Sequence, residues 1–217
     1  MHWVYRVSYP AVYAFYFILC RWQIKGKENV PKEGPLLVVA NHMTNHDPPL
    51  LSVSLGRYVV FMAKEGLFRS RLGGYFMRGL GTFPVRRNGV QREALRTAQQ
   101  VLADGYALAV FPEGMRSRTH KLRRAFPGAA LIALQTGVPV LPVAITGTEA
   151  VKGINWLRRP RLTVTFGQPF CLLPTNGKTG RGECAEYIME RIAELLPAGY
   201  RGVYTGVGVE NNYDSKD

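Results

Sequence analysis

The sequence predicts a single α/β domain with a central sheet, mostly parallel or mixed, that is flanked by helices. Three observations support this fold class. Short apolar segments rich in β-branched residues alternate along the chain with segments of helical periodicity, an order typical of βαβ units. The 217 residues, 47% of them hydrophobic, are enough for one substantial core. No internal repeat or low-complexity block divides the chain.

The N-terminal segment, about residues 3–20, is apolar and aromatic, but Arg6 and Pro10 interrupt it. It is short for a membrane span, which takes about 20 apolar residues, and no small-residue cleavage site follows it. Its aromatic residues and the basic residues after it favour a helix that docks on an anionic membrane surface. A helix packed on the domain and a true span are the alternatives. We expect three parts: a membrane-associating segment (1–22), the main domain (23–205) and a flexible tail (206–217).

The main domain is expected to contain five strands, four of them short apolar runs and the last an alternating one. They are residues 36–40, 58–63, 107–111, 140–145 and 161–166. Apolar residues at helical spacing predict helices at 90–102 and 185–196. Another helix is expected to begin at Pro48, because proline suits the first helical position.

The loop before Pro48 places His42 five positions before Asp47. In a helix, residues five apart point about 140° away from each other, so only a loop can bring these two side chains together. A carboxylate on one ring nitrogen fixes the tautomer of histidine and leaves the other nitrogen to take a proton, so the pair can form a general base. The alternative is that Asp47 only caps the helix. His46 is a rival base, less favoured because a neighbouring side chain rarely points back at its partner in a turn.

Residues 81–87 form a strand-like segment that ends in Arg86 and Arg87. A guanidinium can hold a phosphate through two hydrogen bonds, which lysine does less well. The segment is therefore a candidate phosphate site, and a solvated arginine pair at a strand end is the alternative.

Residues 111–118 follow an expected strand and bring together a carboxylate, a glycine, a hydroxyl and two guanidiniums. Glycine permits close backbone approach, and the other groups suit a polyol phosphate. The alternative is a turn with solvated charges. In residues 138–143, prolines bracket an apolar strand, and we interpret this segment as core.

The composition points to an anionic partner and a reducing compartment. The chain has 28 Lys and Arg residues against 15 Asp and Glu residues, a formal charge of +13. Nucleic acid, a phospholipid surface, a phosphorylated substrate or an acidic carrier protein would each suit this charge. Cys20, Cys171 and Cys184 are widely spaced and follow no metal-ligand pattern, so neither a structural disulfide nor a metal site is expected.

Taken in order, these four segments resemble the four sequence blocks of the glycerolipid acyltransferase family, which includes bacterial 1-acyl-glycerol-3-phosphate acyltransferases. The resemblance covers about residues 24–170. Two positions depart from it, since Met115 stands where threonine is frequent and Arg86 where an acidic residue is frequent. The matching residues are His42 and Asp47 in the first block, Gly81, Phe83 and Arg87 in the second, 111–114 in the third and 138–143 in the fourth.

The resemblance implies direct transfer of an acyl group from acyl-CoA or acyl-carrier protein to the 2-hydroxyl of 1-acyl-glycerol 3-phosphate (lysophosphatidic acid), which gives phosphatidic acid. It implies His42 as the base and Asp47 as the residue that orients it. No metal or organic cofactor is implied beyond the thioester donor. Arg87 and Arg116 would hold the acceptor phosphate, Glu113 would position the glycerol, and Lys64 would add positive charge. The expected substrate-binding residues are Lys64, Gly81, Phe83, Arg87, Glu113, Gly114, Arg116 and Ser117.

With this resemblance, the positive charge has three expected partners: phospholipid headgroups, the acceptor phosphate and the CoA or carrier-protein donor. Nucleic acid is not expected, because no recognised nucleic-acid module accompanies the charge. The expected location is the cytoplasmic face of the cell membrane, as a peripheral or monotopic protein. The alternatives are another lysolipid or glycerol 3-phosphate as acceptor, or a non-catalytic membrane-binding protein on the same scaffold.

Overall fold

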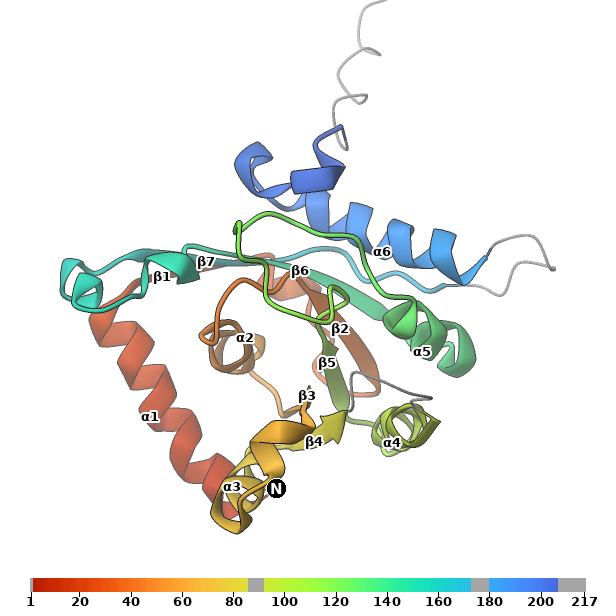
Figure 1. Ribbon diagram of the computed structural model, residues 1–217, viewed down its shortest axis with the longest axis horizontal. Coiled ribbons are helices and arrows are strands. Elements are labelled where there is room, and N and C mark those ends of the chain that lie inside the picture. Colours follow the sequence, from red (N-terminus) through yellow and green to blue (C-terminus); the bar gives the residue numbers. More distant parts are fainter. Residues whose placement is uncertain (1, 86–91, 173–179, 207–217) are drawn as a thin grey trace, which may run out of the picture.

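The computed structural model describes residues 2–85, 92–172 and 180–206 and is built around one seven-stranded sheet (Figure 1). The strands lie in the order β1-β7-β6-β2-β5-β3-β4. Strands β2 to β6 all run in the same direction, β7 is antiparallel to β6, and β1 is parallel to β7. The strands are β1 (Arg21–Lys25), β2 (Leu36–Ala40), β3 (Val59–Lys64), β4 (Thr82–Val85), β5 (Ala107–Val110), β6 (Val140–Thr146) and β7 (Arg161–Phe166).

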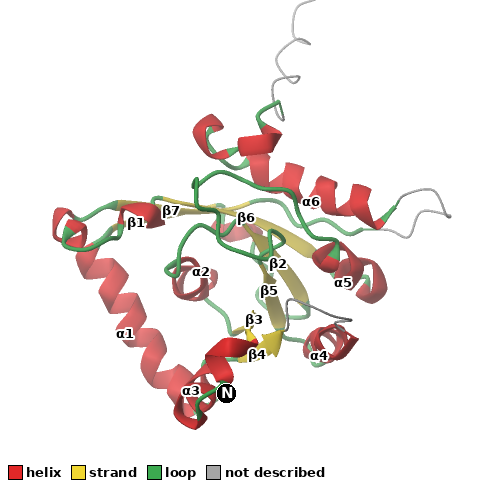
Figure 2. Cartoon of the chain, viewed as in Figure 1, coloured by secondary structure: helices red, strands yellow, loops and turns green. Residues whose placement is uncertain are grey.

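Helices cover both faces of the sheet, as Figure 2 shows. Alternate residues of β2 belong to two different core clusters, because successive side chains of a strand point to opposite faces. α1 and α2 pack on one face, and α4, α5 and α6 pack on the other. The helices are α1 (Trp3–Leu19), α2 (Asp47–Leu55), α3 (Arg71–Gly79), α4 (Arg92–Ala103), α5 (Gly128–Thr136) and α6 (Arg181–Glu194).

The predicted α/β fold with a mostly parallel sheet is confirmed. The five expected strands and the helices at 48, 90–102 and 185–196 are present with small shifts of their ends, and the strand-like segment at 81–87 contains β4. β1, α3 and α5 were not predicted. The expected boundary after residue 22 falls inside β1, three residues after the end of α1 at Leu19, and the division into three parts stays a prediction. The expected tail from 207 onward lies outside the described residues.

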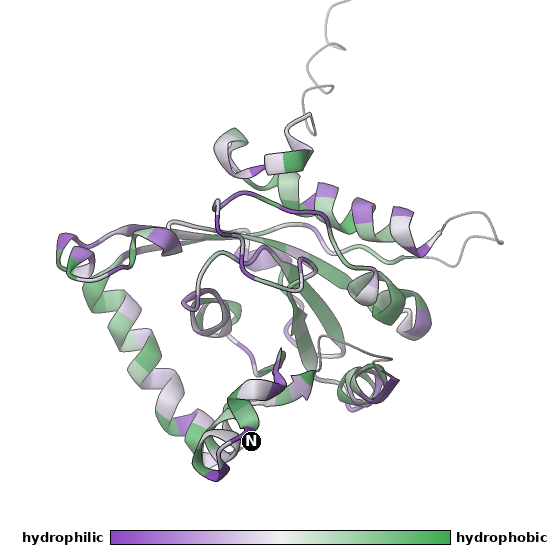
Figure 3. Ribbon diagram, viewed as in Figure 1, coloured by the Kyte–Doolittle hydropathy of each residue, from purple (hydrophilic) through white to green (hydrophobic). Residues whose placement is uncertain are grey.

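α1 packs on the domain through one side and exposes the other. Val4, Tyr5 and Tyr16 are buried, whereas Phe17 and Ile18 are 65% and 62% exposed. Hydropathy colouring shows apolar residues along much of α1 and along the strands, with polar residues on the outer sides of α4 and α6 (Figure 3). None of the helices in the described part of the chain is both long and apolar enough to cross a bilayer.

Candidate active site

The candidate site lies where the parallel strands end. The loop 41–46 follows β2, and the neighbouring strands β5 and β6 are followed by Glu113 and Thr148. Because parallel strands end at the same edge of a sheet, residues more than 100 positions apart meet there. This edge is where open α/β sheets usually bind ligands.

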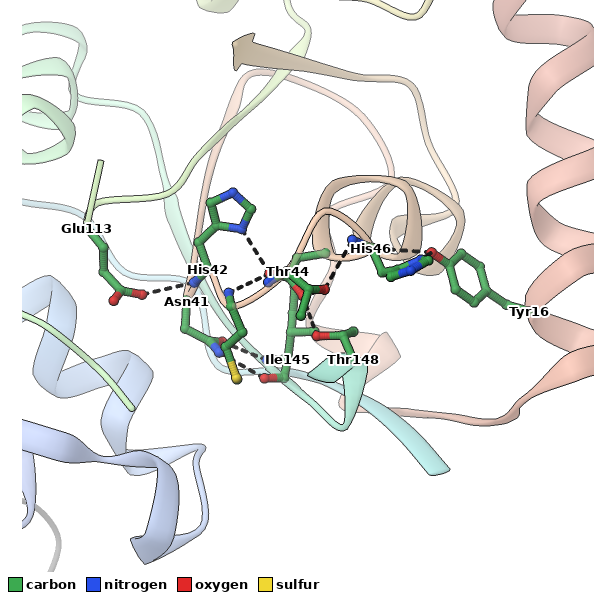
Figure 4. A network of polar contacts seen from close by, with 10 residues as sticks. Tyr16, Asn41, His42, Thr44, His46, Glu113, Ile145 and Thr148 are labelled. Carbon is green, nitrogen blue, oxygen red and sulfur yellow. Dashed lines mark hydrogen bonds and ion pairs between the residues drawn. The ribbon is translucent and has the colours of Figure 1, made fainter. Parts of the chain in front are cut away.

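Asp47 and His42 form the centre of the site (Figure 4). Asp47 begins α2, is fully buried, and is followed by prolines at the first helical positions. Its Oδ2 lies 2.8 Å from Nδ1 of His42 and also accepts the backbone N–H groups of Met43, at 2.6 Å, and Thr44, at 2.7 Å. A carboxylate only accepts hydrogen bonds, so Nδ1 carries the ring proton and Nε2 holds the lone pair.

The second oxygen of Asp47 is held by the turn after the neighbouring strand β6 and by the loop itself. Its Oδ1 accepts the hydroxyl of Thr148, at 2.6 Å, and that of Thr44, at 3.3 Å. Thr148 opens the short turn after β6 and is fully buried. Both carboxylate oxygens therefore have partners, which satisfies a buried charged group and fixes its direction.

Asn41 fixes the start of the loop. Its side chain donates to the carbonyl of Ile145 at 2.8 Å and accepts the N–H of the same residue at 2.7 Å. This pair continues the pairing of β2 with β6 by one residue beyond β2. Neither Asn41 nor Thr148 was singled out from the sequence, because each bonds to a residue more than 100 positions away.

Glu113 holds the backbone of His42. Its Oε1 accepts the N–H of His42 at 2.9 Å, and its Oε2 accepts the N–H of Arg123 at 3.1 Å. The carbonyl of His42 accepts the N–H of Ser117 at 2.8 Å, so the segment after β5 binds both backbone groups of His42. Burial raises the pKa of the Glu113 carboxyl from 4.5 to about 7, although these two N–H groups oppose the shift. The glycerol contact expected of Glu113 stays a prediction.

The ring of His42 packs against the protein on one face and remains partly exposed to solvent. It stacks on Phe111, with ring centroids 4.2 Å apart and planes 22° from parallel. Its side chain keeps 17% exposure, which leaves part of the ring within reach of a ligand. His46 faces away from Asp47, toward α1, and its Nδ1 lies 3.3 Å from Oη of Tyr16.

The two expected glycines have backbone reasons to be glycine. Gly81 has φ +77°, and a Cβ there would lie 2.6 Å from the hydroxyl oxygen of Tyr58. Gly114 has φ +65°, and a Cβ there would lie 2.8 Å from the ring of Phe126. Positive φ and lack of space both favour glycine at these turns, so their presence needs no ligand contact.

The remaining expected residues are spread along the same edge. Phe83 is half-buried in β4, whereas Lys64 at the end of β3 and Arg116 in the loop after β5 are exposed. Ser117 is buried, and its hydroxyl lies 3.2 Å from that of Thr119. Arg87 lies outside the described residues. The structure therefore groups His42, Asp47, Glu113 and Ser117 and leaves Lys64 and Arg116 at the surface.

Several known proteins are similar to this chain. A family model described as acyltransferase matches residues 21–146. A protein named 1-acyl-sn-glycerol-3-phosphate acyltransferase from Bacillus subtilis is 28% identical over 180 residues, which are 80% of this chain and 87% of that protein. A chloroplastic protein of the same name from Brassica napus is 34% identical over 144 residues, 65% of this chain.

Coverage of these relatives differs. The matched part spans 40% of the Brassica napus protein and 39% of one from Arabidopsis thaliana, so the chain spans about two fifths of these plant relatives. A crystal structure of the 1-acyl-sn-glycerophosphate acyltransferase PlsC from Thermotoga maritima matches with a TM-score of 0.65 and 29% identity. That match covers 85% of this chain and 74% of the other.

Proposed function

The chain belongs to the acyltransferase family, and on that premise we propose that it is a membrane-associated 1-acylglycerol-3-phosphate O-acyltransferase. It would move a fatty acyl group from acyl-CoA or acyl-carrier protein to the 2-hydroxyl of lysophosphatidic acid, giving phosphatidic acid. The observation that carries the proposal is the buried Asp47 carboxylate on Nδ1 of His42, since it leaves Nε2 free to act as a base.

The proposed reaction needs no covalent enzyme intermediate. Nε2 of His42 takes the proton of the acceptor hydroxyl while that oxygen attacks the thioester carbonyl. The carbon–sulfur bond then breaks, and the leaving thiolate takes the proton back from the imidazolium. Asp47 stabilises the imidazolium between these two steps and keeps the ring in one tautomer.

The acceptor phosphate is proposed to bind to the basic groups at the same sheet edge. Lys64 ends β3, which pairs with β5, and Arg116 lies in the loop after β5; both side chains are exposed. Arg87 follows β4 in the sequence and is the third candidate. In lysophosphatidic acid the phosphate is only a few bonds from the reacting hydroxyl, so its site must lie close to His42.

Membrane association is proposed through a surface formed by α1 and α3. The two helices are joined where the indole N–H of Trp3 donates to the Tyr75 hydroxyl at 2.9 Å and where Gly79 packs against Val4. Both helices expose apolar and aromatic side chains, and exposed arginines lie on α3 and just before it, a combination that suits an anionic bilayer surface. This docking surface consists of Trp3, Val7, Phe17, Ile18, Leu72, Tyr75, Phe76, Arg69, Arg71 and Arg78.

His42→Ala tests the proposed activity, with His46→Ala as the matched control. Removing a general base should lower the rate of acyl transfer by about 10²–10⁴-fold, whereas His46→Ala should keep most of it. The rate is measured as transfer of a radiolabelled acyl group to lysophosphatidic acid, with folding checked by circular dichroism. A panel of lysolipids crossed with acyl-CoA and acyl-carrier protein identifies the acceptor and the donor. Unchanged turnover in His42→Ala would favour a non-catalytic role, and an equal loss in His46→Ala would remove His42 as the specific base.

A further inference from the structure

A second basic site lies next to the candidate active site. A cavity of about 520 Å³ is lined on one side by Lys121, Arg123 and Arg124, and on the other by residues between 198 and 205. Figure 1 shows the segment between β5 and α5 arching toward this C-terminal segment. The cavity therefore joins two parts of the chain that are about 80 positions apart in the sequence.

The backbone on which these side chains stand is fixed in place. The N–H of Leu122 donates to the carbonyl of Tyr200 at 2.8 Å, and the Leu122 side chain is buried. Gly202 has φ +56°, and a Cβ there would lie 2.2 Å from the carbonyl oxygen of Leu122, so only glycine allows this contact. With Leu122 held inward, Lys121 and Arg123 on either side of it are exposed.

This cavity carries a high positive charge, and Arg123 also interacts electrostatically with the nearby Glu113 carboxylate. Residues 116–124 contain five Lys or Arg residues and no Asp or Glu. In the described parts of the chain, no carboxylate lies within ion-pair distance of the side chains of Lys121, Arg123 or Arg124. Unpaired guanidinium and ammonium groups around a hollow favour a ligand with phosphate groups.

The Glu113 carboxylate lies between this cavity and His42, the proposed base. The backbone N–H of Arg123 donates to one oxygen of Glu113, and the backbone N–H of His42 donates to the other. The phosphate of lysophosphatidic acid must lie beside the reacting hydroxyl. An acyl-CoA donor instead carries its phosphates at one end and its thioester at the other, with a flexible arm between them.

We propose that this cavity binds the phosphate-bearing nucleotide end of acyl-CoA, so that the arm reaches His42 with the thioester. This inference rests on the proposed function. The cavity volume of about 520 Å³ is within the roughly 300–1,000 Å³ of small-molecule sites, which is enough for the nucleotide end of CoA. In this proposal Lys121 and Arg124 bind the donor, and the basic groups at the same sheet edge as His42 bind the acceptor phosphate.

The test combines binding of CoA with turnover of two donors. Lys121→Gln/Arg124→Gln should weaken CoA binding, measured by calorimetry, and raise the KM for acyl-CoA, each by about tenfold. The KM for lysophosphatidic acid should not change. The KM for an acyl-pantetheine thioester with the same acyl chain should not change either, because this donor lacks phosphate. Arg96→Gln, which removes an exposed arginine of α4, is the matched control and should behave as the wild type.

Three results would overturn the donor site. The first is an unchanged CoA affinity in the double variant. The second is an equal rise of the KM values for acyl-CoA and acyl-pantetheine in that variant. The third is that the wild type uses acyl-carrier protein as donor but does not bind CoA. Failure of the proposed function would look different. A chain that binds CoA through Lys121 and Arg124 but transfers no acyl group to any lysolipid would keep the CoA site and remove the acyltransferase activity.

Discussion

Two buried carboxylates organise the candidate site at the scale of single residues. Asp47 bonds to the His42 ring, to loop N–H groups and to Thr148, so it fixes the direction of a side chain. Within the described residues, Glu113 bonds to backbone N–H groups alone, so it fixes the position of the chain that carries His42. The contact between His42 and Asp47 was predictable because only five positions separate them and a proline follows. The contacts of Thr148 and Glu113 were not, because they depend on which strands become neighbours.

Thr148→Val tests whether the hydroxyl on Asp47 supports the base. Valine has the same shape but cannot donate, so Asp47 loses one hydrogen bond and the His42 ring is held less firmly. We expect kcat to fall about tenfold with little change in either KM, from the usual effect of losing a buried hydrogen bond to a charged group. Thr148→Ser should recover most of the rate, since it restores the hydroxyl. A loss of stability without the change in kcat, or no recovery in Thr148→Ser, would contradict this positioning role.

Glu113 predicts how stability depends on pH. Its pKa is raised by burial from 4.5 to about 7, so between these pH values the folded protein holds a proton that the unfolded chain has released. The free energy of unfolding should therefore fall as pH rises from about 4.5 to about 7, by at most about 1.4 kcal/mol per pH unit, and then level off. In Glu113→Gln this fall should be absent. Urea unfolding of both proteins from acid to alkaline pH measures it, and a constant difference between them would contradict the raised pKa.

At the scale of elements, the sequence predicted the strands that are apolar throughout and missed elements defined by distant partners. β2 and β6 are buried on both faces, and their sequences are therefore continuous apolar runs. β1 alternates polar and apolar residues at the edge of the sheet and pairs with β7, about 140 positions later. α5 was not predicted because it is almost uniformly apolar and has no polar stripe that shows a helical period. α3 was not predicted because three of its nine residues are glycines, which disfavour helices.

The docking surface of α1 and α3 predicts which changes release the protein from membranes. Deleting residues 1–20 would also remove Tyr16, which is 1% exposed and part of the core, so release could then reflect unfolding. Phe17→Ser/Ile18→Ser changes only exposed side chains and should weaken binding to anionic vesicles by about 10²–10⁴-fold, since each buried apolar side chain contributes about 1.5–3 kcal/mol. Vesicle sedimentation measures the loss. Tyr187→Ser on α6, 42% exposed, is the control, and equal effects of the two changes would place the membrane contact elsewhere.

At the scale of the whole molecule, the His42 loop lies between two surfaces of different character. Figure 4 shows His42 with Tyr16 of α1 on one side and Glu113 of the loop after β5 on the other. On the α1 side is the apolar docking surface, and beyond Glu113 is the basic cavity lined by Lys121 and Arg124. A lipid acceptor would thus reach the base from the membrane and a water-soluble donor from the opposite side.

Salt should separate two contributions to membrane binding: the electrostatic attraction that comes from the net charge of +13, and the burial of apolar side chains. Attraction between exposed arginines and anionic headgroups is screened as the Debye length falls from about 10 Å at 0.1 M salt to about 3 Å at 1 M, whereas burial of apolar side chains is not weakened by salt. Binding of the wild type to anionic vesicles should therefore fall with salt, by about tenfold or more, to a residual level equal to its binding to neutral vesicles. Phe17→Ser/Ile18→Ser should lose the residual level and keep the salt-dependent part. Sedimentation over a salt series with both vesicle types measures this, and salt-independent binding of the wild type would show that the positive charge serves the substrates alone.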